Sequence, residues 1–210
     1  MSAASLGFDA RQAVRHLKRA DPCLAKLISE LGPLRLSVRP AGSPFEALLR
    51  AITYQQLSGK AAATIHSRLL DLFPKGLTPE RLLDVPEASL RVAGLSRNKM
   101  LSVRDLATKA LDATVPDFST LEAMSDEDII ERLTAVRGVG RWTVEMLLIF
   151  TLGRPDVLPL DDLGIRKGFQ RAYHMKRLPA AVTMLRAGRL WMPYRSVASW
   201  YLWRAVDARV

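Results

Sequence analysis

The sequence has little of what disulfides, metal sites and membrane segments require. Its 210 residues include one cysteine, Cys23, which excludes a disulfide within the chain and any cysteine-ligated zinc or iron–sulfur site. The three histidines are scattered without metal-ligand spacing. No apolar run reaches the ~18–20 residues of a membrane span, and the opening MSAASLGFDARQ lacks the apolar segment of a signal peptide. We therefore expect no membrane partner and an intracellular location: cytoplasmic (nucleoid) in a bacterium, nuclear in a eukaryote.

Charge is what the sequence has in excess. Lysine and arginine number 31 against 21 aspartates and glutamates, which gives a formal net charge of +10. A surplus of this size on a small chain indicates a polyanionic partner, and nucleic acid is the first candidate. The alternative is a ribosome-associated or merely basic surface.

Helix start and stop signals dominate the chain. Asp9 with Gln12 predicts a capping box for a helix that runs towards Ala20. Ser43-Pro44-Phe45-Glu46 predicts a second start, and its apolar residues, Phe45, Leu48, Leu49 and Ile52, share one helical face. Further helices are expected from Pro22 to Gly32, from Pro86 to Gly94, through Asp112, from Ser119 with Glu122, and from Ser125 with Asp128.

Only the stretch LRLSVR, residues 34–39, alternates like a strand. We therefore predict an all-α fold of roughly ten short helices. The favoured division is two helical lobes. Residues 44–158, with the hairpin of 133–150, form one lobe, and residues 1–43 plus 159–210 form the other.

The segment Gly138-Val139-Gly140 predicts a tight turn between two helices. Two glycines permit positive φ, and Val139 would anchor the turn in the core. The following helix N-terminus, with Thr143 in its first turn, has unpaired N–H groups that can bind a DNA phosphate, and Arg141 adds positive charge. The alternative is a purely structural corner between helices.

Two adjacent acids, Asp161 and Asp162, follow some twenty residues later at the predicted start of a helix. One interpretation is an N-cap, which aspartate often provides. The other is catalytic, because an ionised carboxylate can stabilise an oxocarbenium-like sugar as an N-glycosidic bond breaks and can orient the attacking water. We expect Asp161 to cap the helix and Asp162 to react.

The hairpin followed by this aspartate resembles the helix-hairpin-helix–GPD superfamily of DNA glycosylases. Within it, GRWT, LPLDDLGIRKG and PYRSVASWYLW are similar to the alkylbase branch, the AlkA-like 3-methyladenine DNA glycosylase II proteins, over roughly residues 40–207. The resemblance implies base excision repair: hydrolysis that releases alkylated purines such as 3-methyladenine and 7-methylguanine from double-stranded DNA. It also implies Asp162 as the catalytic residue and a DNA-binding cleft between the lobes.

Trp142 stands where bifunctional relatives carry a lysine that forms a Schiff base with the sugar. The resemblance therefore implies a monofunctional enzyme without lyase activity. Two alternatives stay open: a helix-hairpin-helix DNA-binding module without catalysis, and a glycosylase for deaminated or oxidised bases.

The resemblance also nominates residues for a wedge and for a base pocket. Gln56 and Leu57 would be the wedge that fills the stack after the nucleotide is extruded. The base pocket would be formed by Trp142, Trp203, Tyr54, Phe45 and Met146, whereas Trp191 and Trp200 are assigned to the core. From the hairpin geometry and from positive charge, we expect the DNA backbone to be held by Gly138, Gly140, Arg141, Thr143, Lys60, Arg166, Lys167 and Arg195. No cofactor or metal is required, although relatives suggest a sodium or potassium ion at the hairpin backbone of Thr134, Val136 and Val139. We expect a monomer.

Overall fold

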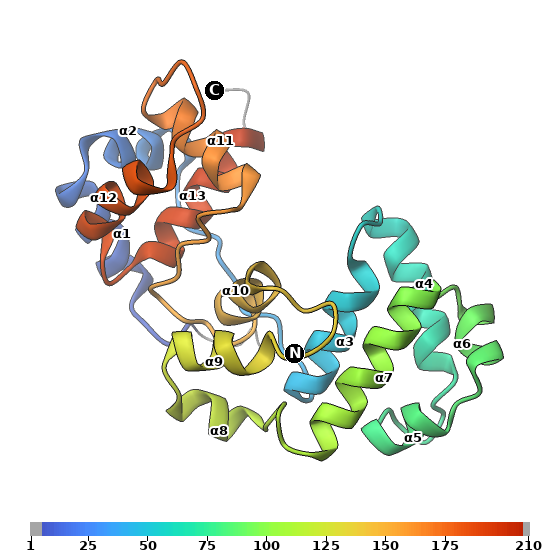
Figure 1. The fold of residues 1–210 in the computed structure, drawn as a ribbon. Coiled ribbons are helices and arrows are strands. Elements are labelled where there is room, and N and C mark those ends of the chain that lie inside the picture. The colour runs from blue at the N-terminus through green and yellow to red at the C-terminus, as the bar shows by residue number, and fades with distance from the viewer. Residues whose placement is uncertain (1–5, 208–210) are drawn as a thin grey trace. The chain divides into compact units, whose positions relative to one another are not determined.

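The computed structural model describes residues 6–207, and in this range the chain forms thirteen helices (Figure 1), as the all-α prediction requires. The helices are α1 (Ala10–Ala20), α2 (Pro22–Leu31), α3 (Pro44–Tyr54), α4 (Gly59–Asp71), α5 (Pro79–Asp84), α6 (Glu87–Ala93), α7 (Arg97–Leu111), α8 (Phe118–Ala123), α9 (Asp126–Leu133), α10 (Arg141–Phe150), α11 (Leu163–Ala172), α12 (Ala181–Trp191) and α13 (Arg195–Asp207). None of these helices is long and apolar enough to cross a membrane.

Local sequence signals place most helix ends correctly. Asp9, Ser43 and Ser125 accept backbone N–H bonds as N-caps, and Gly32 and Gly94 follow the ends of α2 and α6. The predicted start at Ser119 is wrong by two residues. Asp117 caps α8 instead, because its carboxylate accepts bonds from both the backbone N–H of Thr120 and the hydroxyl of Ser119.

The chain divides into two compact units. The middle unit is Ala41–Leu147, and the terminal unit combines the chain up to Pro40 with the chain from Leu148 onward. The first boundary lies close to the expected one, whereas the second lies earlier than the expected residue 158. The reason is packing: Leu158 belongs to the core of the terminal unit, and the N–H of Val157 donates to Ser196 Oγ at 2.9 Å.

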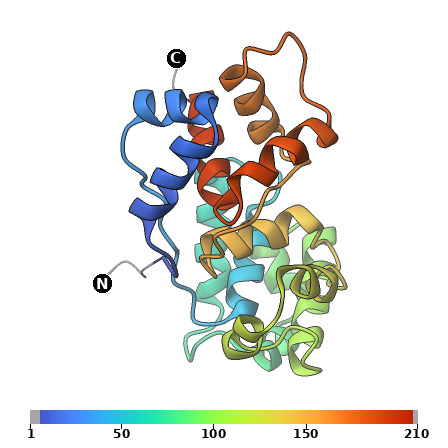
Figure 2. The same ribbon diagram turned by 90° about the vertical axis from the view of Figure 1, so that its left-hand side faces the viewer.

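In the terminal unit, the N-terminal helices α1 and α2 lie beside the C-terminal helices α12 and α13, which both ribbon views show (Figures 1 and 2). Asp21 helps to join them: it caps α2, and its other oxygen accepts the Trp191 indole N–H at 2.9 Å and the Tyr173 hydroxyl. Trp191 is fully buried, as predicted. The apolar core comprises Ala13, Leu17, Leu24, Leu27, Ile28, Leu158, Ile165, Phe169, Met184, Trp191, Val197, Ala198, Tyr201, Leu202 and Ala205.

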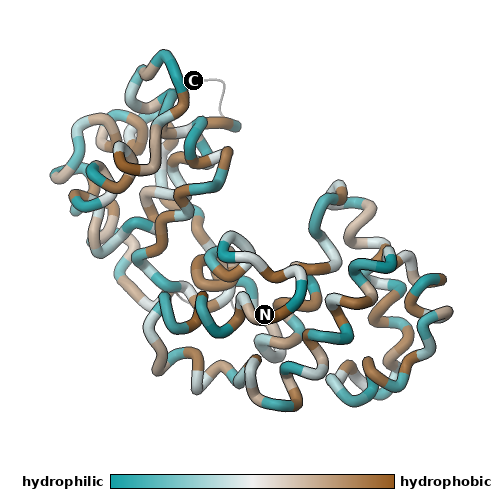
Figure 3. The backbone as a smooth tube through the Cα atoms, viewed as in Figure 1, coloured by the Kyte–Doolittle hydropathy of each residue, from teal (hydrophilic) through white to brown (hydrophobic). Residues whose placement is uncertain are grey.

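In the middle unit, α3 packs against α4 and α7, and α7 also contacts α5 and α6. The predicted apolar face of α3 is buried at each of its four positions. Figure 3 shows the underlying pattern, in which hydrophobic and hydrophilic residues alternate along the helices.

The 34–39 stretch alternates without forming a regular strand. Leu36 and Val38 are buried, whereas Arg35, Ser37 and Arg39 are exposed. The Arg39 N–H donates to Phe150 O at 2.7 Å, so the extended segment is fixed to the end of α10.

Candidate functional site

Asp162 stands at the N-terminus of α11, where two N–H groups hold its side chain. Its Oδ1 accepts the backbone N–H of Ile165 and the indole N–H of Trp203, both at 2.8 Å. A helix N-terminus favours negative charge, and each donor limits the rotation of the carboxylate. The side chain is half-buried, so the group is fixed in direction and still reaches the surface of the terminal unit.

The expectation that Asp161 caps the helix is wrong. Asp162 itself caps α11, whereas Asp161 is exposed in the turn before the helix. The error arises because both acids lie at the helix start, and only backbone geometry decides which one aims at the free N–H groups. Capping does not remove Asp162 from chemistry, because a carboxylate has two oxygens and about four acceptor positions.

Trp203 comes from α13 and contacts Asp162 edge-on through its indole N–H. Its ring also packs against Phe150, with ring centroids 5.6 Å apart. Gly164 makes this approach close: a Cβ atom there would lie 2.9 Å from Trp203 Cδ1 and 3.0 Å from Asp162 Oδ1. Sequence reasoning missed Gly164 and Phe150. Glycine lowers the stability of a helix relative to alanine. Gly164, at the second position of α11, could therefore have indicated that another group packs closely against it.

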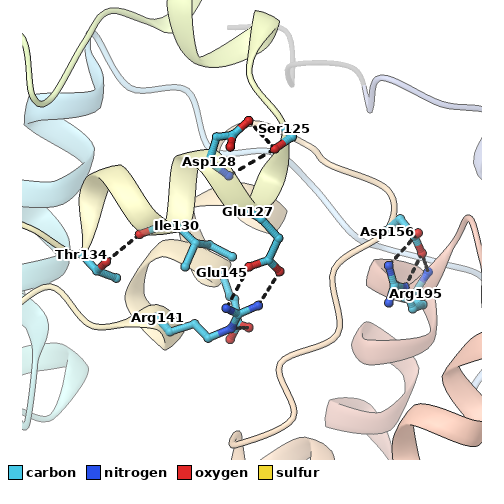
Figure 4. A network of polar contacts seen from close by, with 9 residues as sticks. All are labelled: Ser125, Glu127, Asp128, Ile130, Thr134, Arg141, Glu145, Asp156 and Arg195. Carbon is cyan, nitrogen blue, oxygen red and sulfur yellow. Dashed lines mark hydrogen bonds and ion pairs between the residues drawn. The ribbon is translucent and has the colours of Figure 1, made fainter.

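The loop that leads to Asp162 is anchored on the start of α13. Arg195 forms a two-pronged ion pair with Asp156, with Nε–Oδ1 at 2.7 Å and Nη2–Oδ2 at 2.9 Å (Figure 4). Ser196 donates to Arg154 O at 2.7 Å and accepts from the Val157 N–H. Arg195 was predicted to bind the DNA backbone, but this bidentate, half-buried pair gives it a structural role instead.

The predicted hairpin lies between α9 and α10. Gly138 has φ +77°, and a Cβ atom there would lie 2.7 Å from Ser102 Oγ, so both conformation and space require glycine. Val139 is buried, as predicted. Gly140 does not have positive φ, so the expectation of positive φ at both glycines is wrong for Gly140. Its carbonyl accepts the N–H groups of Thr143 and Val144, and the space around its Cα is open.

Arg141, the first residue of α10, is held by two carboxylates. Its guanidinium bonds both oxygens of Glu127, at 2.6 and 3.0 Å, and Glu145 Oε1 at 3.1 Å (Figure 4). Hydrogen bonding to Glu127 raises the pKa of Arg141 above its ordinary value. Its charge is therefore compensated within the protein. Arg141 links the two helix starts of the hairpin to each other, and its contact with a DNA phosphate stays a prediction.

Thr143 lies in the interior of the hairpin and not at the position of the predicted phosphate contact. Its side chain is buried, and its backbone N–H donates to Gly140 O at 2.9 Å. Neither group is exposed for a phosphate, so Thr143 belongs to the hairpin core.

At the predicted cation position, the Val136 carbonyl accepts the Val139 N–H at 3.0 Å, and carbonyl oxygens have a second lone pair for a ligand. Within residues 6–207, no cluster of histidine, cysteine or acidic side chains could hold a metal ion.

The predicted wedge forms a sharp loop after α3. Gln56 is exposed with φ +59°, a left-handed conformation that residues other than glycine rarely adopt. Leu57 follows and is 40% exposed, a large value for leucine. An exposed apolar side chain on a strained loop is what a wedge requires.

Four of the predicted pocket residues differ in how far they are exposed to solvent. Phe45 is a core residue of α3 and only 5% exposed, so it cannot line a base pocket as predicted. Tyr54 is half-buried under the guanidinium of Arg50, 4.2 Å from the ring centroid. Met146 is half-buried, and Trp142 is 48% exposed on the middle unit. An indole this exposed lacks a core role, which supports its prediction as a contact residue.

Three predicted backbone contacts keep accessible cationic groups. Lys60 and Lys167 are exposed, and Arg166 is half-buried with one bond from Nη2 to Pro179 O at 3.3 Å. Lys60 lies on the middle unit, and Arg166 and Lys167 follow Asp162 in α11 of the terminal unit. Their DNA contacts stay predictions.

Comparison with known proteins gives a consistent result. Residues 49–193 match the family model described as HhH-GPD superfamily base excision DNA repair protein. DNA-3-methyladenine glycosylase 1 of Schizosaccharomyces pombe is 38% identical over 183 residues, which cover 86% of this chain and 79% of that protein. The structure of the S. pombe enzyme Mag1 in complex with abasic DNA has a TM-score of 0.82 at 36% identity, covering 94% of this chain and 98% of that one. A crystal structure of DNA-3-methyladenine glycosidase from Bacillus halodurans has a TM-score of 0.85 at 32% identity, covering 99% and 94% of the respective chains.

Proposed function

Since the chain belongs to the HhH-GPD superfamily of base excision DNA repair proteins, we propose that it is a monofunctional DNA glycosylase for alkylated purines. It hydrolyses the N-glycosidic bond of bases such as 3-methyladenine and 7-methylguanine in double-stranded DNA, acting as a monomer. The observation that carries the proposal is the Asp162 carboxylate, fixed at the start of α11 by Ile165 and Trp203. The names of the relatives support the substrate class.

The carboxylate acts on the sugar. As the glycosidic bond breaks, positive charge develops at C1′ and the ring oxygen, and a fixed negative charge stabilises this transition state. Asp162 also orients the attacking water and accepts its proton. Because Trp203 and Ile165 hold Oδ1, the group needs no reorganisation as charge develops.

Alkylated purines need little further assistance. Alkylation at N3 or N7 makes the base cationic, which weakens the glycosidic bond and gives a neutral leaving group. A cation over an aromatic face gains about 0.5–2 kcal/mol, so the indole of Trp203 beside Asp162 and the exposed Trp142 are suited to such bases.

Binding to the duplex is mainly electrostatic. The net charge of +10, with Lys60, Arg166 and Lys167 as backbone contacts, attracts phosphates without reading sequence. At the hairpin, the open space beside Gly140 lets a phosphate approach the backbone. The carbonyls of Thr134, Val136 and Val139 are the candidate ligands for a sodium or potassium ion, which would hold the turn rather than take part in the chemistry.

The proposal is tested by a base-release panel. Duplexes with 3-methyladenine, 7-methylguanine, hypoxanthine or 8-oxoguanine are incubated with the protein, and free bases are quantified by chromatography. We expect release of the methylated purines. Release of only deaminated or oxidised bases would show that alkylated purines are not the substrate class. Tight duplex binding with no release would favour the noncatalytic DNA-binding module.

We expect no strand cleavage and no covalent intermediate. Trp142 has no amine to form a Schiff base, so borohydride added during turnover should trap no protein–DNA adduct. A bifunctional glycosylase treated in parallel serves as the positive control. An adduct formed by this protein would contradict the hydrolytic mechanism.

A further inference from the structure

One face of α7 carries three polar residues that the proposed chemistry does not use. Lys99, Ser102 and Asp105 follow at three-residue spacing, which places them on the same side of the helix. All three contact segments proposed to touch DNA.

Lys99 holds the start of the wedge loop. Its ammonium donates to Thr53 O at 2.6 Å and to Gln55 O at 2.9 Å, where α3 ends. The last carbonyls of a helix have no partner within the helix, and a cation is favourable there. Lys99 is half-buried, and the two bonds fix the backbone just before Gln56 adopts its left-handed conformation.

Ser102 and Asp105 hold the hairpin. Asp105 Oδ2 accepts the backbone N–H of Arg137 at 2.7 Å, and Ser102 packs against the Cα of Gly138. The loop and the hairpin are also linked directly, because the side-chain amide of Gln55 donates to Gly138 O at 2.9 Å. Helix α7 and Gln55 thus join both segments within the middle unit.

We propose that Lys99 is a positioning residue that presents the Gln56–Leu57 wedge to the vacated stack, in a fixed relation to the phosphate-binding hairpin. The inference rests on the proposed function, since the wedge has a role only where a nucleotide leaves the stack. A strained loop keeps one conformation only while its flanks are held, and Lys99 and Gln55 are the flanking anchors. Pre-forming the loop removes the ordering cost of insertion at the moment of binding.

The test compares two duplexes that differ only in the need for a wedge. One contains a tetrahydrofuran abasic analogue, and the other is undamaged. Lys99→Met should weaken binding to the abasic duplex about tenfold, since misplacement of a contact group has effects of this order or larger. Binding to the undamaged duplex should change no more than in Arg91→Gln, the matched control. The control substitution also removes one positive charge, from an exposed ion pair that Arg91 forms with Glu87 on α6.

Three further results complete the test. Lys99→Arg should restore abasic binding, because a guanidinium can donate to both carbonyls. Leu57→Ala combined with Lys99→Met should be little worse than Leu57→Ala alone, because both act through one side chain. Gln55→Ala should give the same abasic-specific loss, which provides a second route should Lys99→Met fail to fold by circular dichroism.

Equal losses on both duplexes, or additive losses in the double variant, would overturn the positioning role. The binding measurement does not depend on catalysis. A protein that releases no base but shows the abasic-specific loss would refute the proposed activity and keep the wedge assignment.

Discussion

Asp162→Asn is expected to lower the single-turnover rate of 7-methylguanine release by at least about 100-fold, the scale seen when one preorganised electrostatic group is removed. Asparagine has nearly the same shape, and its side-chain oxygen can still accept the N–H groups of Ile165 and Trp203. The helix start should therefore be preserved. What the variant lacks is the negative charge that stabilises the transition state. Chromatography of the free base over time measures the rate.

The matched control is Asp161→Asn, which makes the same charge change one residue away on an exposed side chain. Its release rate should stay close to that of the parent protein, and Asp162→Asn should keep the parent melting temperature and its affinity for abasic duplex. Undiminished release by Asp162→Asn, or an equal loss in both variants, would remove Asp162 from the catalytic role.

Gly168→Ala should strongly destabilise the terminal unit. Helix α11 packs along α13 at this residue, and an added Cβ would lie 1.9 Å from the carbonyl oxygen of Leu202 and 2.6 Å from its carbonyl carbon. The obstacle is backbone, which cannot rotate away, so the helices would have to separate. Overpacking costs about 1–3 kcal/mol in ordinary cores, and we expect this substitution at or above the upper end of that range.

Activity should be lost together with stability in Gly168→Ala. Asp162 precedes α11 and Trp203 lies on α13, so separation of the two helices breaks the bond that holds the carboxylate. Urea unfolding measures the change in free energy. Gly59→Ala is the control, because Gly59 is exposed and nothing lies within 4 Å of an added Cβ. A Gly168→Ala protein as stable as the control would show that α11 and α13 do not approach so closely.

The sequence predicted the elements that depend on neighbouring residues. The caps at Ser43 and Ser125, and the glycine after α2, rely on bonds within four residues, so their patterns are visible in the chain. Asp162 was nominated as the catalytic residue by a family motif that is local in the same way. Where two local signals competed, as at Asp117 and Ser119, the prediction chose the wrong cap.

What could not be predicted depends on contacts between distant residues. The bond from Trp203 to Asp162 spans 41 positions, and that from Lys99 to Thr53 spans 46. The pairing of Arg141 with Glu127 and of Arg195 with Asp156 likewise follows from packing. Their positive charge suggested that these arginines bind DNA, and only the fold shows that each forms an ion pair with a carboxylate of the protein.

One measurement tests the hydrolytic mechanism most directly. A duplex with a single 7-methylguanine is incubated with excess protein, and free base and strand integrity are followed in the same samples, before and after alkali. We expect each released base to leave one alkali-labile site, on a strand that is intact until alkali is added. Strands already cut before alkali, or no free base at all, would contradict the hydrolytic mechanism.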